Sequence, residues 1–405
     1  MALRHWMQLA LTDGIGPVLL RRLVERAGSP ADACTATATL LREVDGIGTH
    51  KAASIAGALH RAIDLVDREL ERAAALGLRV LCPEDQDYPA LLHDIPDAPP
   101  VLWMRGRLEP RDLNAVAIVG SRRCSLYGRE QSERFASLLA STGITVVSGG
   151  ARGIDSSAHR GALRVNGGRT VAVLGSGVDV PYPPENEQLF NDIASRGAVL
   201  SEFPPGTPPA AENFPRRNRI VSGMSRGVLV VEADERSGAL ITARQAIDDH
   251  NRPVFAIPGR VDNPLSNGPH RLIREGAILV TGLQDLLDGL EPLPQSVHDR
   301  PTCEGIAPDD PSSTLFDAPG VPEPEKRAST RQTRPTPVGD PSDAAILEAI
   351  GDEELTADAI VERSGLDAGA VMTRLTMLTL QGRVERRGGQ RFARRRQSSY
   401  PAGLT

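Results

Sequence analysis

Aromatic residues are scarce in this chain of 405 residues, and long apolar runs are missing. Phe, Trp and Tyr together make up 3% of the residues, so the core must be built from Val, Ile, Leu and Ala. No stretch approaches the ~18 consecutive apolar residues that a membrane-spanning helix needs. The first residues also lack the apolar core and the small-residue cleavage site of a secretory signal. We therefore expect a cytoplasmic protein with no membrane association.

Cysteine and lysine are also rare, and each shortage removes a class of site. The four cysteines lie far apart with no CxxC pair, which argues against a zinc site and against a disulfide framework. Only Lys51 and Lys326 stand among the 46 basic residues, and neither follows the GxxxxGKS or GxxxxGKT pattern of a phosphate-binding loop. A P-loop ATPase is therefore excluded, and we expect no metal ion.

The N-terminal region, residues 1–77, contains a short repeat. Asp-Gly-Ile-Gly occurs at 13–16 and again at 45–48, and an apolar helical pattern follows each copy. Each copy predicts helix, tight glycine turn and helix, because glycine accepts the positive φ of such a turn. This resembles the helix-hairpin-helix motif, whose turn amides hold a DNA phosphate; an ordinary turn in a helical bundle explains the pattern equally well. We take Gly46 and Gly48 as secondary DNA contacts of a helix-hairpin-helix (SAM-like) domain.

The region 78–290 alternates strand-length apolar runs with helical segments. The expected strands are Ala115–Val119, Thr145–Ser148, Thr170–Leu174, Ala198–Ser201, Val228–Glu232, Pro253–Ile257 and Ala277–Val280. Nearly all-apolar strands separated by helices indicate a mainly parallel sheet that helices cover on both faces. The expected fold class is therefore α/β, with a Rossmann-like, doubly wound sheet.

Two changes of composition follow the sheet. Residues 291–340 hold ten of the 32 prolines and few apolar residues, which is typical of a flexible linker. Residues 341–396 then predict three helices and a β-hairpin, the pattern of a winged helix-turn-helix, before a tail at 397–405. Seven arginines fall within 383–396, so the wing is a plausible phosphate contact through Arg386 and Arg387.

The carboxyl ends of the predicted strands share glycine, serine and arginine. Ligands of doubly wound sheets bind at this edge, where glycine lets the backbone approach a phosphate and arginine offers a charged fork. Phe214 adds a ring on which a base could stack, although packing in the core is the common role of such a ring. The predicted DNA contacts are Gly120, Ser121, Arg122, Ser148, Gly149, Gly150, Arg152, Gly153, Gly175, Ser176, Gly177, Phe214, Arg216, Arg217, Asn218, Arg219, Ser237 and Gly238.

Two other readings of this edge remain to be weighed. A dinucleotide cofactor would require GxGxxG after the first strand, and Gly120-Ser-Arg-Arg-Cys-Ser does not match, so we expect no cofactor. A hydrolase could use Asp155 with His159, or Glu232 with Asp234. A helix-capping role for Asp155 is favoured over acid–base catalysis, because Asp is a leading N-cap residue.

In combination, these motifs resemble the DNA-processing protein A (DprA/Smf) family. The matching segments are Ala117-Ile-Val-Gly-Ser-Arg122, Ser148-Gly-Gly-Ala-Arg-Gly-Ile-Asp155, Val171-Ala-Val-Leu-Gly-Ser-Gly177, Phe214-Pro-Arg-Arg-Asn-Arg-Ile220 and Ser237-Gly-Ala-Leu-Ile-Thr242. The resemblance implies a protein that binds and protects incoming single-stranded DNA, forms a homodimer through the Rossmann-like domain, and helps to load RecA recombinase in natural transformation.

The resemblance also implies a distant relation to the lysine-decarboxylase-like (LOG) nucleotide phosphoribohydrolases. Those enzymes carry a PGGxGTxxE motif, whereas the comparable segment here reads Glu232-Ala-Asp-Glu-Arg-Ser-Gly-Ala-Leu-Ile-Thr. The departure favours binding without catalysis, so we expect a protein that is not an enzyme. A LOG-like N-glycosidase that uses the same pocket is the alternative.

Overall fold

The computed structural model describes residues 2–290, 341–351, 353–380, 383–387 and 391–394, and the predicted linker and tail lie outside them. The chain divides into two compact units, residues 1–303 and 304–405. No helix in these described ranges is long and apolar enough to cross a membrane.

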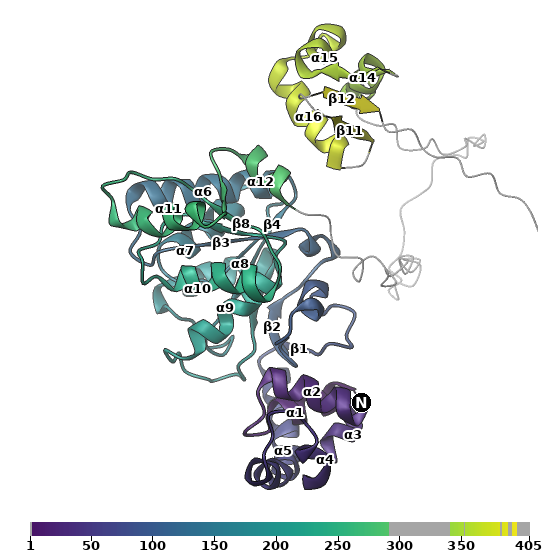
Figure 1. Cartoon of the computed structure of the whole chain (residues 1–405), viewed down its shortest axis with the longest axis vertical. Helices are drawn as coiled ribbons and strands as arrows, with labels where there is room; N and C mark the ends of the chain where they lie inside the picture. Colours follow the sequence, from purple (N-terminus) through teal and green to yellow (C-terminus); the bar gives the residue numbers. More distant parts are fainter. Residues whose placement is uncertain (1, 291–340, 352, 381–382, 388–390, 395–405) are drawn as a thin grey trace, which may run out of the picture. The chain divides into compact units, whose positions relative to one another are not determined.

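The first unit begins with a group of helices, drawn in purple in Figure 1. They are α1 (Ala2–Ala10), α2 (Pro17–Ala27), α3 (Pro30–Cys34), α4 (Ala38–Arg42) and α5 (Thr49–Ala75). The two Asp-Gly-Ile-Gly segments form the turns before α2 and α5, with φ of +88° at Gly14 and +92° at Gly46. The helix after the second turn, α5, is 27 residues long.

A nine-stranded sheet follows, in the order β1-β2-β6-β5-β4-β3-β7-β8-β9. Its strands are β1 (Arg79–Leu81), β2 (Leu102–Gly106), β3 (Ala115–Val119), β4 (Thr145–Ser148), β5 (Thr170–Val173), β6 (Ala198–Ser201), β7 (Val228–Val230), β8 (Val254–Ala256) and β9 (Ile278–Leu279). The seven strands β6, β5, β4, β3, β7, β8 and β9 are neighbours in this order and pair in parallel. β2 pairs antiparallel with β6, and β1 pairs antiparallel with β2 at the edge of the sheet. The predicted α/β fold with a mainly parallel sheet is confirmed, while strand β2, which lies between β1 and β6, was not predicted.

The helices of the sheet lie on its two faces. They are α6 (Leu126–Ser141), α7 (Ile154–Arg164), α8 (Glu187–Arg196), α9 (Asn213–Gly223), α10 (Gly238–Arg244), α11 (Asn267–Arg274) and α12 (Leu283–Gly289), with a π-helical turn η4 (Gln245–Asp249) after α10. Short 3₁₀ turns are η1 (Ala90–Asp94), η2 (Pro110–Leu113), η3 (Pro184–Asn186) and η5 (Pro264–Ser266).

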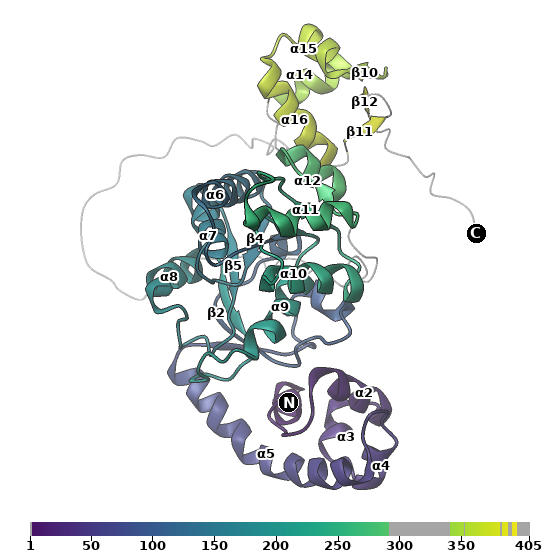
Figure 2. The same cartoon turned by 60° about the vertical axis from the view of Figure 1, so that its left-hand side comes forward.

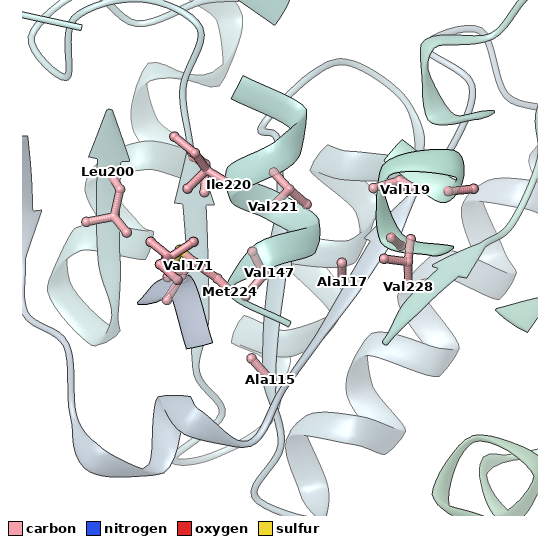
Figure 3. Packing of buried hydrophobic residues seen from close by; sticks show 14 of the residues in the cluster. Ala115, Ala117, Val119, Val147, Val171, Leu200, Ile220, Val221, Met224 and Val228 are labelled. Atoms are coloured by element: carbon pink, nitrogen blue, oxygen red, sulfur yellow. The ribbon is translucent and has the colours of Figure 1, made fainter. Parts of the chain in front are cut away.

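Alternation along β3 shows how the sheet is covered. Ala115, Ala117 and Val119 pack in one buried cluster with α9, α10 and α11, and Val116 and Ile118 pack in another with α6, α7 and α12. Successive side chains of a strand point to opposite faces, so an all-apolar strand needs helices on both sides. Figure 3 shows Ile220 and Val221 of α9, with Met224 just beyond its end, packed against the first of these faces. The carboxyl half of α9 is thereby anchored in the core.

The second unit forms a small domain of its own. It contains α14 (Pro341–Ile350), β10 (Leu355–Thr356), α15 (Ala357–Ser364), α16 (Ala368–Leu380), β11 (Val384–Arg387) and β12 (Arg391–Arg394), visible in Figure 2. β12 lies between β10 and β11, and both pairings are antiparallel. A buried cluster that includes Ile346, Ile360, Leu375 and Phe392 joins the helices to the hairpin. This is the predicted winged helix.

Candidate nucleic-acid interface

A pocket with a volume of about 760 Å³ lies at the carboxyl ends of β3, β4 and β7. β3 is the strand from which the chain winds outward in both directions, first through β4 to β6 and later through β7 to β9. Neighbouring loops diverge at such a switch point and leave a crevice beyond the strands. Of the predicted contacts, this crevice is lined by Gly120, Ser121, Arg122, Gly149, Phe214, Arg217, Asn218, Ser237 and Gly238.

Arg217 supplies a buried cation at the floor of this pocket. Its side chain comes from α9, is 4% exposed, and donates through Nη1 to the carbonyl oxygens of Gly149 and Val173. Its Nε has no hydrogen-bond partner. Burial lowers the pKa of Arg217 to about 10, while nearby Asp155 opposes the shift and Arg122 adds to it. Because a buried guanidinium is costly without an anion, this position favours a negatively charged ligand.

Phe214 and Tyr182 form an aromatic wall beside the two arginines. Their ring centroids are 5.6 Å apart, and the guanidinium of Arg122 lies 4.7 Å from the centroid of the Phe214 ring. Gly175 passes directly behind Phe214, since a Cβ on this glycine would stand 2.9 Å from the ring. A partly exposed ring next to two guanidinium groups provides a surface for a base and charges for its phosphates.

The opposite wall of the pocket comes from the start of α10. Ser237 caps this helix by accepting from the backbone N–H of Ala239, and Gly238 is its first residue. Asn218 of α9 reaches across, with Nδ2 at 3.4 Å from the carbonyl oxygen of Gly238. Asp234 and Arg236 complete the lining, although sequence analysis did not select them as contacts. Both residues follow the carboxyl end of β7, and this position in the sequence could have identified them as pocket residues.

The remaining predicted contacts do not line this pocket, and most have identifiable partners. Arg152 and Gly175 border a small niche behind Phe214, where Arg152 forms an ion pair with Glu185. Arg216 lies 5.1 Å from the ring centroid of Phe203. The hydroxyls of Ser148 and Ser176 donate to the carbonyl oxygens of Ile118 and Val180. The other three positions are glycines in close contact with neighbouring residues: a Cβ would overlap Phe190 at Gly150, Ser121 at Gly153 and Asp179 at Gly177.

The structure places Arg219 differently from the sequence prediction. The sequence predicted a phosphate fork on a loop, but Phe214–Ile220 belongs to helix α9 and the Arg219 side chain is 5% exposed. Its guanidinium donates to Glu202 and to the carbonyl oxygen of Asp97, so it is directed away from the pocket lining. Residues 217 and 219 are ~200° apart around an α-helix, which explains why one enters the pocket and the other does not.

The acidic residues weighed for hydrolysis have structural contacts. Glu232 is 1% exposed, and its carboxylate accepts from the backbone N–H and the hydroxyl of Ser125. Asp155 lines the pocket and accepts from the N–H of Ala151, and its pKa is raised by burial. His159 bonds to Thr170 at 2.7 Å through Nδ1. No group of three His, Cys, Asp or Glu residues in the described ranges could hold a metal ion.

The secondary contacts lie on other elements. Gly48 is the N-cap of α5, and next to Gly46 the side chain of Asp45 pairs with Arg22 at 3.1 Å. Arg386 and Arg387 lie in β11 opposite Phe392 and Arg391 of β12, but their side chains are outside the described residues. A DNA-binding role for the turn and for the wing remains a prediction.

The fold and this site define a Rossmann-like protein with an arginine-lined pocket at the carboxyl edge of its sheet. A sequence model of the family described as DNA recombination-mediator protein A matches residues 79–291, and one described as DprA winged helix domain matches residues 330–390. The chain belongs to the DNA processing protein A (DprA/Smf) family, which confirms the resemblance seen in its motifs.

Known proteins are similar over most of the chain. Protein Smf of Synechocystis sp. is 38% identical over 397 residues, which cover 96% of this chain and 98% of that protein. The X-ray structure of DprA from Streptococcus pneumoniae matches with a TM-score of 0.63 at 36% identity, over 71% of this chain and 98% of that one. A structure of DprA from Helicobacter pylori, described for its single-stranded DNA binding mode, matches with a TM-score of 0.47 at 30% identity, over 52% and 94%.

Proposed function

We propose that this protein binds single-stranded DNA in the pocket between β3, β4 and α9, without catalysing a reaction there. The observation that carries this proposal is Arg217, a buried cation with an unpartnered Nε beside a partly exposed aromatic ring. Backbone of Gly120 and Gly149 together with Arg122 offers hydrogen-bond donors to a phosphate. Bases could stack on Phe214, and stacking on a ring depends little on sequence.

Binding without catalysis is supported by the surroundings of the acidic groups. The carboxylate of Glu232 is held by Ser125, and the sequence lacks the PGGxGTxxE motif of the LOG enzymes. A Cβ on Gly128 would overlap the carboxylate of Glu232, so the helix backbone lies tightly against it. Glu232 therefore serves to fix the start of α6, and it has no room to reach a substrate.

A homodimer and the loading of RecA recombinase complete the proposal. β9 is the terminal strand of the sheet, and its residues Ile278 and Leu279 are 37% and 45% exposed. An apolar edge strand is a ready template for pairing with a second copy. The family is described as a recombination mediator, which supports a role in handing bound DNA to a recombinase.

A binding isotherm with labelled single-stranded and blunt duplex oligonucleotides, at several salt concentrations, tests this function. We expect preference for the single strand, and a fall of log affinity with log salt of about 0.7 per phosphate neutralised. Equal affinity for the duplex would refute it. Incubation with nucleoside monophosphates is the parallel assay, in which release of free base would establish the N-glycosidase alternative.

A further inference from the structure

A buried ionic cluster lies on the side of α9 that faces away from the pocket. The guanidinium of Arg219 donates to Glu202, donates to the carbonyl oxygen of Asp97 at 2.5 Å, and has its Nε at 3.4 Å from the Asp97 carboxylate. The side chains of Arg219 and Glu202 are 5% and 4% exposed. His250 borders the cluster, with Nε2 at 3.9 Å from Asp97 and Nδ1 at 3.0 Å from the hydroxyl of Ser222.

The cluster joins α9 to three segments that are distant in the sequence. Glu202 follows β6, Asp97 lies in the connector after η1, and His250 follows η4. Ser222 adds a second contact from α9 itself, one turn beyond Arg219. The carboxyl half of α9 thus has an ionic attachment through Arg219 and Ser222, in addition to the apolar one that Ile220 and Val221 give it, with Met224 at its C-cap (Figure 3).

The opposite side of α9 carries residues of the pocket. Phe214, Arg217 and Asn218 project from it into the pocket, where Arg217 lies near the like charge of Arg122. Nearby Asp155 and the carbonyl oxygens of Gly149 and Val173 hold Arg217 in place. Without a bound anion, its burial and its repulsion by Arg122 act against this position, and a small rotation of α9 would bring Arg217 toward water. The cluster opposes this rotation, because turning the helix would separate Arg219 from the buried carboxylate of Glu202 and from the half-buried one of Asp97.

We propose that Arg219, held by Glu202 and Asp97, is a positioning residue that fixes the rotation of α9 and so presents Phe214 and Arg217 to the ligand. It acts through the helix and does not touch DNA. This inference rests on the proposed single-strand binding at the same pocket. It goes beyond that proposal by assigning a role in binding to residues that lie outside the pocket lining.

Three variants separate positioning from charge and from general stability. Arg219→Met removes the cation, and Glu202→Gln removes one carboxylate charge but keeps an oxygen that can accept from Arg219. Arg169→Met is the matched control, since Arg169 is also buried, at 3% exposed, and pairs with Asp112 at 2.6 Å. Arg169 precedes β5, at the opposite end of the strands from the pocket.

The first measurement is affinity for a labelled single-stranded oligonucleotide at several salt concentrations. We expect the first two variants to bind about tenfold more weakly with an unchanged salt slope, and folded Arg169→Met to bind like the wild type. A slope reduced by about 0.7 in Arg219→Met would show a direct phosphate contact and overturn the proposal. Wild-type affinity in Glu202→Gln would overturn it as well.

The second measurement is hydrogen exchange of the α9 amides without DNA. We expect faster exchange for the helical amides of residues 217–222 in Glu202→Gln and no change there in Arg169→Met. Unchanged exchange in Glu202→Gln would refute the anchoring role. This result does not depend on DNA binding, so it tests the anchoring role even if the proposed function is wrong.

The double variant Arg219→Met with Glu202→Gln leaves fewer buried charges unpaired than Arg219→Met alone. It should therefore be more stable than Arg219→Met but bind single strands no better. Regained affinity would contradict positioning.

Discussion

Replacing Gly149 by alanine gives the sharpest test of the pocket. An added Cβ would stand 2.5 Å from Cζ of Arg217, so the guanidinium must leave its place between the carbonyls of Gly149 and Val173. A hydrogen bond from a charged donor contributes about 1.5–3 kcal/mol. If the ligand uses the same cation, the affinity for single-stranded DNA should fall by about 2 kcal/mol, which is roughly 30-fold.

Gly238→Ala is the matched control, because Gly238 also lines the pocket but has nothing within 4 Å of an added Cβ. It also begins α10, where alanine is favoured over glycine. Fluorescence anisotropy with a labelled oligonucleotide measures affinity, and circular dichroism confirms that both variants are folded. Wild-type affinity in folded Gly149→Ala would refute the assignment of Arg217 as the anion contact. An equal loss in both variants would show that the effect is not specific to Arg217.

Three further predictions concern Arg122 of the pocket, the buried His159 and the second unit. Arg122→Ala should weaken binding uniformly across sequences and lower the salt slope by about 0.7, and an unchanged slope would place the phosphate elsewhere. Burial lowers the pKa of His159 from 6.5 to about 3, so the free energy of unfolding should fall as the pH drops below 6.5, by about 2 kcal/mol between pH 6.5 and 5. Denaturant titrations at both pH values measure this loss, and the loss should be absent in His159→Gln. A fragment that ends at Gly320 should fold and bind single strands with a shallower salt slope, and loss of binding at low salt would make the winged helix the primary site.

The periodicity of the sequence was sufficient for the fold class. All seven expected strands of the parallel sheet are present, because an all-apolar run such as Ala115–Val119 can be satisfied only by helices on both faces. Strand β2 escaped notice, since its segment Leu102–Gly106 lies in a proline-rich connector and its pairing partners are β1 and β6. Pairing between distant segments leaves no local signal in the sequence.

The location of the pocket also followed from the sequence, since glycine, serine and arginine after successive parallel strands must meet at one edge. Arg122, Phe214 and Arg217 were found this way. The direction of each arginine was decided only by tertiary structure. Phe214-Pro-Arg-Arg-Asn-Arg219 looks like a basic loop, but as a helix it divides its cations between two sides. Arg217 meets two backbone carbonyls and the pocket, whereas Arg219 meets Glu202 and Asp97, which lie 17 and 122 positions away in the chain. The sequence therefore determined which charges are present, and the packing of α9 against distant segments determined which of them a ligand can reach.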